Sequence, residues 1–122
     1  MVVNKQESAR SLALSVLEQV FDQGAYSNIA LNKALESSRL SAQDKGLVTE
    51  LVYGTVSRKI TLEWYLARFI EDREKLDTWV YYLLMLSLYQ LLYLDKLPIH
   101  AVVNEAVQIA KRGRGTDKFV NA

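Results

Sequence analysis

The run from residue 78 to residue 94 constrains this chain most, because it holds no charged side chain and is apolar on every side of a helical projection. A helix that is apolar all round is normally buried. The run is shorter than the roughly 20 residues that cross a bilayer, and Asp77 and Asp95 bound it. The sequence therefore predicts a central core helix over about 77–94 and no membrane span.

A second helix should follow the core helix after a tight break at Pro98, because proline is tolerated best in the first turn of a helix. Apolar residues then recur at helical spacing, with polar residues around the other side. The face expected to be buried consists of Ile99, Val102, Val103, Ala106, Val107 and Ala110.

The same spacing predicts a long helix near the start of the chain. Asn4 and Glu7 have the form of a capping box, and Gly24 suits a C-terminal cap. The apolar face of this first helix would comprise Ala9, Leu12, Ala13, Val16, Leu17, Val20 and Phe21.

Three shorter helices are expected between the first helix and the core helix. Ser27 can cap the second helix, and Ser41 with Asp44 marks the start of the third. Gly54 lies in the middle of the third helix, where glycine costs about 1 kcal/mol against alanine, so we expect another helix to pass close to its backbone. Thr61 would begin a fourth helix with the buried residues Leu62, Tyr65, Leu66, Phe69 and Ile70.

These elements together predict an all-α fold, because no stretch alternates with period two over strand length. We expect a bundle of six to seven helices around the core helix, forming a single domain over 1–122. Thr116 could cap a seventh helix beginning at Asp117, which stops after barely more than one turn, before Phe119 and Val120 gain apolar companions. A helix this short is not stable alone, which favours a domain cut from a longer chain.

The composition narrows the function classes. The chain has 15 Lys and Arg against 14 Asp and Glu, so the overall charge of +1 does not indicate a polyanionic partner. The lack of cysteine excludes disulfides, thiolate metal sites and cysteine nucleophiles, and it fits a reducing cytoplasm. The first ten residues lack the apolar run of a secretory signal. A cytoplasmic protein with no membrane partner is expected.

Basic residues gather in three places that could contact phosphates. The run near residue 111 is broken by two glycines and could track a phosphate backbone, or it could complement the dipole of a helix end. The N-terminal pair could instead be a solubilising surface. For the pair between the third and fourth helices, a surface salt bridge between two helices is favoured. The candidates are Lys5 and Arg10, Arg58 and Lys59, and Lys111, Arg112, Arg114 and Lys118.

Four tyrosines of the core helix, Tyr81, Tyr82, Tyr89 and Tyr93, could be interpreted as a platform for stacking bases. Their place in the most apolar helix instead favours core residues with phenol tips at the surface. His100 has no second ligand or nucleophile at useful spacing. No metal site is predicted.

Several motifs resemble the NusB family. Val103–Asn104–Glu105–Ala106–Val107 after Pro98 and the closing Lys118–Phe119–Val120–Asn121 resemble its carboxy-terminal signature, and Arg10 matches the arginine that opens its first helix. Three stretches are more similar to the NusB-like amino-terminal domain of ribosomal RNA small subunit cytosine-5 methyltransferases of the RsmB or Sun type. They are Glu50–Leu51–Val52–Tyr53–Gly54–Thr55 with Arg58, Tyr89–Gln90–Leu91–Leu92–Tyr93, and Pro98–Ile99–His100–Ala101–Val102–Val103–Asn104–Glu105–Ala106.

The resemblance implies a helical bundle that binds ribosomal RNA without catalysis. In the parent enzymes a Rossmann-like domain follows, which binds S-adenosylmethionine and uses cysteine chemistry on cytosine. This chain has no cysteine and no strand followed by a glycine-rich loop that could hold the cofactor, so we expect no catalytic residue and no cofactor in it. The implied partners are ribosomal RNA, the chain's own C-terminal catalytic domain and a second copy in a homodimer.

Three hypotheses remain for the function. The favoured one is the RNA-recognition domain of a ribosomal RNA methyltransferase. The others are a freestanding antitermination factor that pairs with a ribosomal protein, and a helical protein-interaction module without an RNA role.

Overall fold

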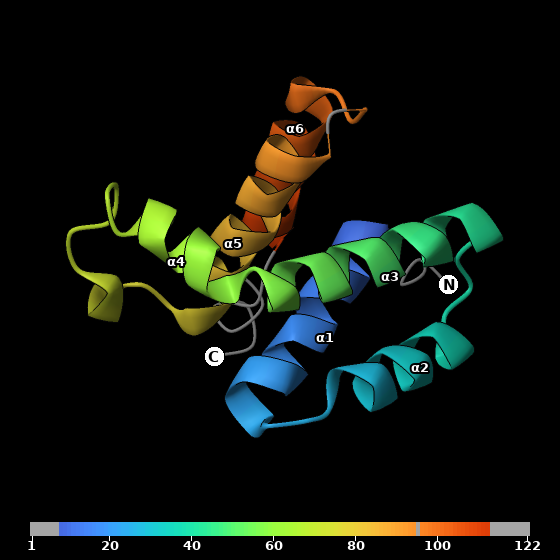
Figure 1. Cartoon of the computed structure of the whole chain (residues 1–122). Helices are drawn as coiled ribbons and strands as arrows, with labels where there is room; N and C mark the ends of the chain where they lie inside the picture. The colour runs from blue at the N-terminus through green and yellow to red at the C-terminus, as the bar shows by residue number, and fades with distance from the viewer. Residues whose placement is uncertain (1–7, 95, 113–122) are drawn as a thin grey trace.

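The fold is all-α, as predicted (Figure 1). The computed structural model describes residues 8–94 and 96–112, and within these ranges it contains helices and no strand. The expected seventh helix from Thr116 lies outside the described residues. The elements are α1 (Ala9–Gln23), α2 (Ser27–Ser37), α3 (Ala42–Ser57), α4 (Lys59–Leu66), the short 3-10 helix η2 (Arg73–Lys75), α5 (Thr78–Tyr93) and α6 (Ile99–Arg112).

The two ends of α1 are fixed by local caps. The Ser8 side chain accepts a hydrogen bond from the backbone N–H of Ser11, and the Ser11 hydroxyl accepts one from the backbone N–H of Ser8. This reciprocal pair starts the helix, whereas the predicted box of Asn4 and Glu7 lies outside the described residues. At the other end Gly24 adopts the left-handed conformation, with φ of 72°. Its predicted role as a C-terminal cap is confirmed.

The starts of the next helices follow the sequence signals only in part. The Ser41 hydroxyl accepts a hydrogen bond from the backbone N–H of Asp44 at 3.1 Å, so the predicted start of α3 is confirmed. Ser27 is not a cap, because it is already the first residue of α2. The predicted start of the fourth helix at Thr61 is also wrong. The chain turns directly from α3 into α4, which begins at Lys59.

The helix α5 is the centre of the bundle, as its uncharged sequence predicted. It packs against α1, α3, α4 and α6, while α2 lies beside α1 and α3 (Figure 1). α1 and α5 run antiparallel, because Arg10 near the start of α1 bonds Gln90 near the end of α5, and Asp22 bonds Tyr82 at the opposite ends. The largest fully buried side chains include Leu17, Leu31, Leu51, Leu62, Met85 and Leu86.

Burial of α5 is nevertheless not complete. Leu84, Leu91 and Leu92 are exposed, so the expectation of a helix buried on every side is wrong. The four neighbours of α5 leave one of its sides without a covering element among the described residues.

The apolar face predicted for α6 is mostly wrong. Val102 is 1% exposed and Ala106 is half-buried, but Ile99 is 69% exposed, and Val103, Val107 and Ala110 are exposed as well. Ile109, which the prediction did not include, is buried. The reason is that α6 packs mainly against α5. A single neighbouring helix covers a narrow stripe, and the apolar residues of α6 span a wider arc than that stripe.

The fourth helix is shorter than predicted. Leu62 and Leu66 are buried as expected, but α4 ends at Leu66. Phe69 therefore leaves the helical register, and it is 78% exposed rather than buried.

The glycine in the middle of α3 marks a close helix crossing, as predicted. A Cβ atom added to Gly54 would collide with Cζ and Oη of Tyr89, and it would lie 2.6 Å from Cε1 of the same ring. Tyr89 belongs to α5 and is buried. Because Gly54 has no side chain, the Tyr89 ring can pack directly against the backbone of α3.

Candidate nucleic-acid interface

Only some of the predicted basic residues fall within the part of the chain that the structure describes. Lys5, Arg114 and Lys118 lie outside the described residues, and so does the side chain of Arg112, the last residue of α6. Lys111 is exposed in the last turn of α6. The proposed phosphate-tracking role of this run stays a prediction.

Arg10 has its partners inside the protein. Its Nε donates to the Gln90 side-chain oxygen at 2.5 Å, and its Nη1 pairs with the Glu105 carboxylate at 2.5 Å. The Arg10 side chain is only 13% exposed. Gln90 is itself buried and donates to the Leu86 carbonyl at 3.0 Å. Arg10 therefore links α1, α5 and α6 and has a structural role; we call this set of contacts the junction.

The two basic residues between α3 and α4 have different surroundings. The Arg58 guanidinium is exposed and lies 4.1 Å from the centroid of the Tyr93 ring, a cation–π contact. Lys59 pairs with Glu63 one turn later at 3.1 Å, and Arg73 approaches the same carboxylate at 3.3 Å. Lys59 therefore forms a salt bridge within α4, not the one between helices that the sequence favoured, while Arg58 presents an exposed cation stacked on an aromatic ring.

Three of the four tyrosines of α5 are buried, as predicted. Two of them donate hydrogen bonds to carboxylates. The hydroxyl of Tyr82 donates to Asp22 at 2.5 Å, and that of Tyr89 donates to Glu50 at 2.7 Å. Burial, together with these hydrogen bonds, raises the pKa of each of these two hydroxyls to about 12. Both phenols consequently remain protonated donors at neutral pH.

Sequence reasoning missed an exposed aromatic and basic surface on α4. Trp64 is 57% exposed, and the Arg68 guanidinium lies 4.9 Å from the centroid of its ring. Ile60, one turn before Trp64, is also strongly exposed. Arg68 lies in the turn that follows the end of α4 at Leu66, so helical spacing alone could not have identified this pair.

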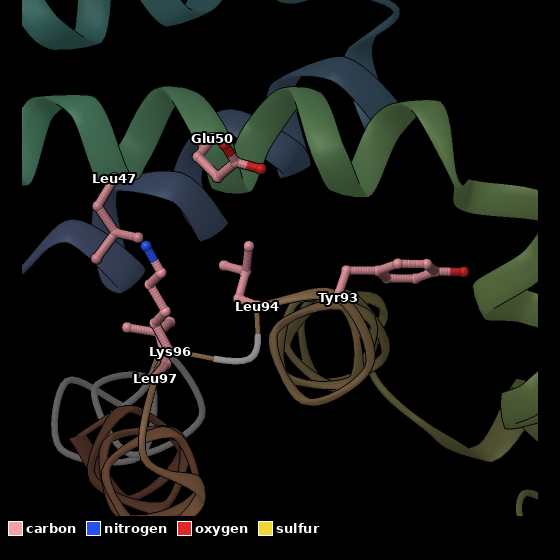
Figure 2. A pocket seen from close by; sticks show the side chains of 6 residues that line it. All are labelled: Leu47, Glu50, Tyr93, Leu94, Lys96 and Leu97. Carbon is pink, nitrogen blue, oxygen red and sulfur yellow. The ribbon is translucent and has the colours of Figure 1, made fainter.

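A cavity of about 420 Å³ lies between α3, the end of α5 and the turn that leads to α6. Figure 2 shows Leu94 pointing toward Glu50 and the Lys96 side chain reaching toward Leu47, while the Tyr93 ring points away from the other residues. The cavity is lined by Leu47, Glu50, Tyr93, Leu94, Lys96 and Leu97. Mostly apolar walls therefore carry one carboxylate and one ammonium group.

Other kinds of site have little support in the part of the chain that the structure describes. No group of three His, Cys, Asp or Glu side chains in these residues could hold a metal ion. Among residues 8–94 and 96–112, each helix is either too short or too polar to span a bilayer.

Comparison with known proteins places this geometry in a family. The NusB family matches residues 7–122. The probable ribosomal RNA small subunit methyltransferase B of Bacillus subtilis is 48% identical over 119 residues, which cover 96% of this chain and 27% of that protein. The corresponding protein of Synechocystis is 38% identical over 118 residues, covering 93% of this chain and 26% of the relative.

A third relative, the ribosomal RNA small subunit methyltransferase B of Escherichia coli, is 36% identical over 111 residues, 87% of this chain and 24% of its own length. The chain thus spans about a quarter of the length of the curated relatives it matches, in their N-terminal part. With a family match over almost all of its residues, the chain belongs to the NusB family.

Proposed function

We propose that this chain is the RNA-binding domain of a cytoplasmic ribosomal RNA methyltransferase and takes no part in the chemistry of methyl transfer. The observation that carries the proposal is the 48% identity, over 119 residues, to the N-terminal part of a protein named as a ribosomal RNA methyltransferase. S-adenosylmethionine and the reacting groups would then belong to the remaining three quarters of the enzyme.

Exposed cations on aromatic rings support RNA as the partner. Arg68 on the exposed Trp64 ring combines a positive charge with a flat surface, and Arg58 adds an exposed cation over the half-buried Tyr93 ring. Single-stranded RNA is bound by such pairs, because bases stack on the rings and phosphates pair with the cations. Lys111 adds a third exposed cation at the end of α6.

The exposed apolar residues of α5 and α6 support a protein partner as well. We name as the docking face Leu84, Leu91 and Leu92 of α5 with Ile99, Val103 and Val107 of α6. Exposed apolar groups mark protein–protein contacts where they form a contiguous surface. The partner we propose is the catalytic domain of the same enzyme, because the relatives are about four times as long as this chain. A homodimer is the alternative occupant, and sedimentation equilibrium of the isolated chain should show a monomer.

RNA binding is tested by titrating fragments of small-subunit ribosomal RNA with the chain at several salt concentrations. Two variants remove candidate contacts: Arg58→Ala with Arg68→Ala, and a triple alanine variant of the run at residues 111, 112 and 114. Lys33→Ala is the matched control, because Lys33 is an exposed cation on α2 and belongs to neither set. Each lost phosphate contact should flatten the slope of log affinity against log salt by about one unit.

The outcomes separate the three hypotheses. Weaker binding and a smaller salt slope in either variant, with Lys33→Ala unchanged, support the proposal and locate the RNA surface. If the unaltered chain does not bind ribosomal RNA, the proposal is wrong and an interaction module becomes the leading hypothesis. The antitermination role has less support, since the relatives named above are methyltransferases.

A further inference from the structure

The cavity between α3 and α5 has the features of a small polar-ended binding site. Its volume of about 420 Å³ falls within the range of sites that hold small molecules. Leu47, Leu94 and Leu97 supply apolar walls that would cover the faces of a flat ring. The carboxylate of Glu50 and the ammonium of Lys96 are the charged groups of this lining.

The Glu50 carboxylate is held in a fixed direction. Its Oε2 accepts the hydrogen bond from the hydroxyl of Tyr89 at 2.7 Å. Tyr89 is buried and its ring lies against Gly54, so this donor has little room to move. Within the described residues Oε1 of Glu50 accepts no recorded hydrogen bond. An exposed and oriented carboxylate oxygen is thus available to a donor entering the cavity.

The Glu50 carboxylate should prefer some bases of RNA over others. A carboxylate accepts hydrogen bonds only, so it prefers an edge that presents neighbouring donors. Guanine offers the N1–H and the N2 amine side by side on its Watson–Crick edge, whereas adenine and cytosine each offer an amine next to an acceptor. Lys96, which lines the cavity, can pair with a phosphate.

We propose that this cavity binds one unpaired guanine nucleotide of RNA, with its Watson–Crick edge on the Glu50 carboxylate and its phosphate on Lys96. The inference rests on the proposed RNA-binding function and gives it a base preference. It also explains why an acidic residue stands in an RNA-binding surface, where its charge would otherwise only repel phosphates.

The test compares short single-stranded RNAs that differ at one central position. Guanine should bind about tenfold more tightly than inosine, which lacks the N2 amine, and more tightly still than adenine. Glu50→Gln keeps the size of the side chain and an acceptor for Tyr89, but it replaces one acceptor with a donor. This variant should lose the preference for guanine over adenine. Lys96→Ala should weaken binding of all sequences and flatten the salt slope by about one unit.

Glu36→Gln is the matched control, because Glu36 is an exposed carboxylate on α2, and the substitution changes the net charge by the same amount. Both Gln variants reduce repulsion of RNA, but only Glu50→Gln should change the base preference. A guanine preference that survives Glu50→Gln, or RNA binding without any base preference, overturns the guanine site and leaves the proposed function standing.

A second measurement does not depend on RNA binding. Guanosine monophosphate should shift the methyl resonances of Leu47, Leu94 and Leu97, and adenosine monophosphate should not. If these shifts occur but the chain binds no ribosomal RNA, the proposed function is refuted and the guanine site is not. If neither nucleotide shifts these resonances and an apolar peptide does, the cavity holds a protein side chain and the inference is wrong.

Discussion

The crossing of α3 and α5 at Gly54 gives a sharp prediction about stability. In Gly54→Ala the new methyl group would overlap the end of the Tyr89 ring. The ring cannot move aside easily, because Tyr89 is buried, donates to Glu50 and is stacked on Tyr93 with 5.4 Å between ring centroids. We therefore expect Gly54→Ala to destabilise the fold.

The expected size follows from three opposing effects. Alanine is better than glycine inside a helix by about 1 kcal/mol. Overpacking of a well-filled core costs about 1–3 kcal/mol, and displacing the Tyr89 hydroxyl from Glu50 costs about 1 kcal/mol more. The net loss in free energy of unfolding should be roughly 1–3 kcal/mol.

Urea unfolding followed by circular dichroism measures this difference. With a slope of about 2 kcal/mol per molar urea, the midpoint should fall by roughly 0.5–1.5 M. The matched control is Gly46→Ala in the same helix, since nothing lies within 4 Å of a Cβ atom there. That variant should be stabilised by up to about 1 kcal/mol.

A double-mutant cycle isolates the cause. In a Tyr89→Leu background the atoms that would overlap the new methyl group are gone, so Gly54→Ala should become neutral or stabilising. If Gly54→Ala behaves like Gly46→Ala in the unaltered chain, the close crossing does not constrain the core and the reasoning is refuted.

Three further predictions concern the junction, the tyrosines and the cofactor. Arg10→Met should lower the free energy of unfolding by about 1–3 kcal/mol in urea titrations, because it leaves Glu105 half-buried without its cation; a neutral result would contradict the junction. Tyr82 and Tyr89 have a pKa raised from 10 to about 12, so the stability they contribute should be complete below pH 10 and lost as the pH rises through 12. Replacing either with Phe should make the fall in melting temperature over this range shallower, and an unchanged profile would contradict the raised pKa. Calorimetry should detect no micromolar binding of S-adenosylmethionine to the isolated chain, and such binding would contradict a non-catalytic role.

The sequence predicted the helices well where the signal is local. Apolar spacing located the six main helices, and the caps at Ser41 and Gly24 depend on residues within one turn. Gly54 was informative because its cost inside a helix requires a compensating contact. Burial was predicted less well, since the spacing of apolar residues says which face is apolar and not how many neighbours cover it. Leu91 and Val103 are exposed for that reason.

The candidate site depends on contacts that no local pattern reveals. Glu50 and Tyr89 are far apart in the sequence and meet only because α3 crosses α5. From the sequence Arg10 looked like a basic surface residue. In the structure it is enclosed, because Gln90 and Glu105 bond it from two other helices. The charge of a side chain can be read from the sequence, but the partner that neutralises it is a property of the packing.

The contact between Tyr89 and Gly54 limits how this domain can diverge during evolution. Tyr89 fills the helix crossing and also directs the Glu50 carboxylate, so a change at position 89 alters folding and the cavity together. Glu50 is exposed, so a replacement that still accepts the hydrogen bond of the buried Tyr89 hydroxyl can be made without disturbing the core. Among descendants of one ancestor, position 50 should therefore vary with the RNA that is bound, whereas positions 54 and 89 should change as a pair, a larger residue at one accompanying a smaller residue at the other.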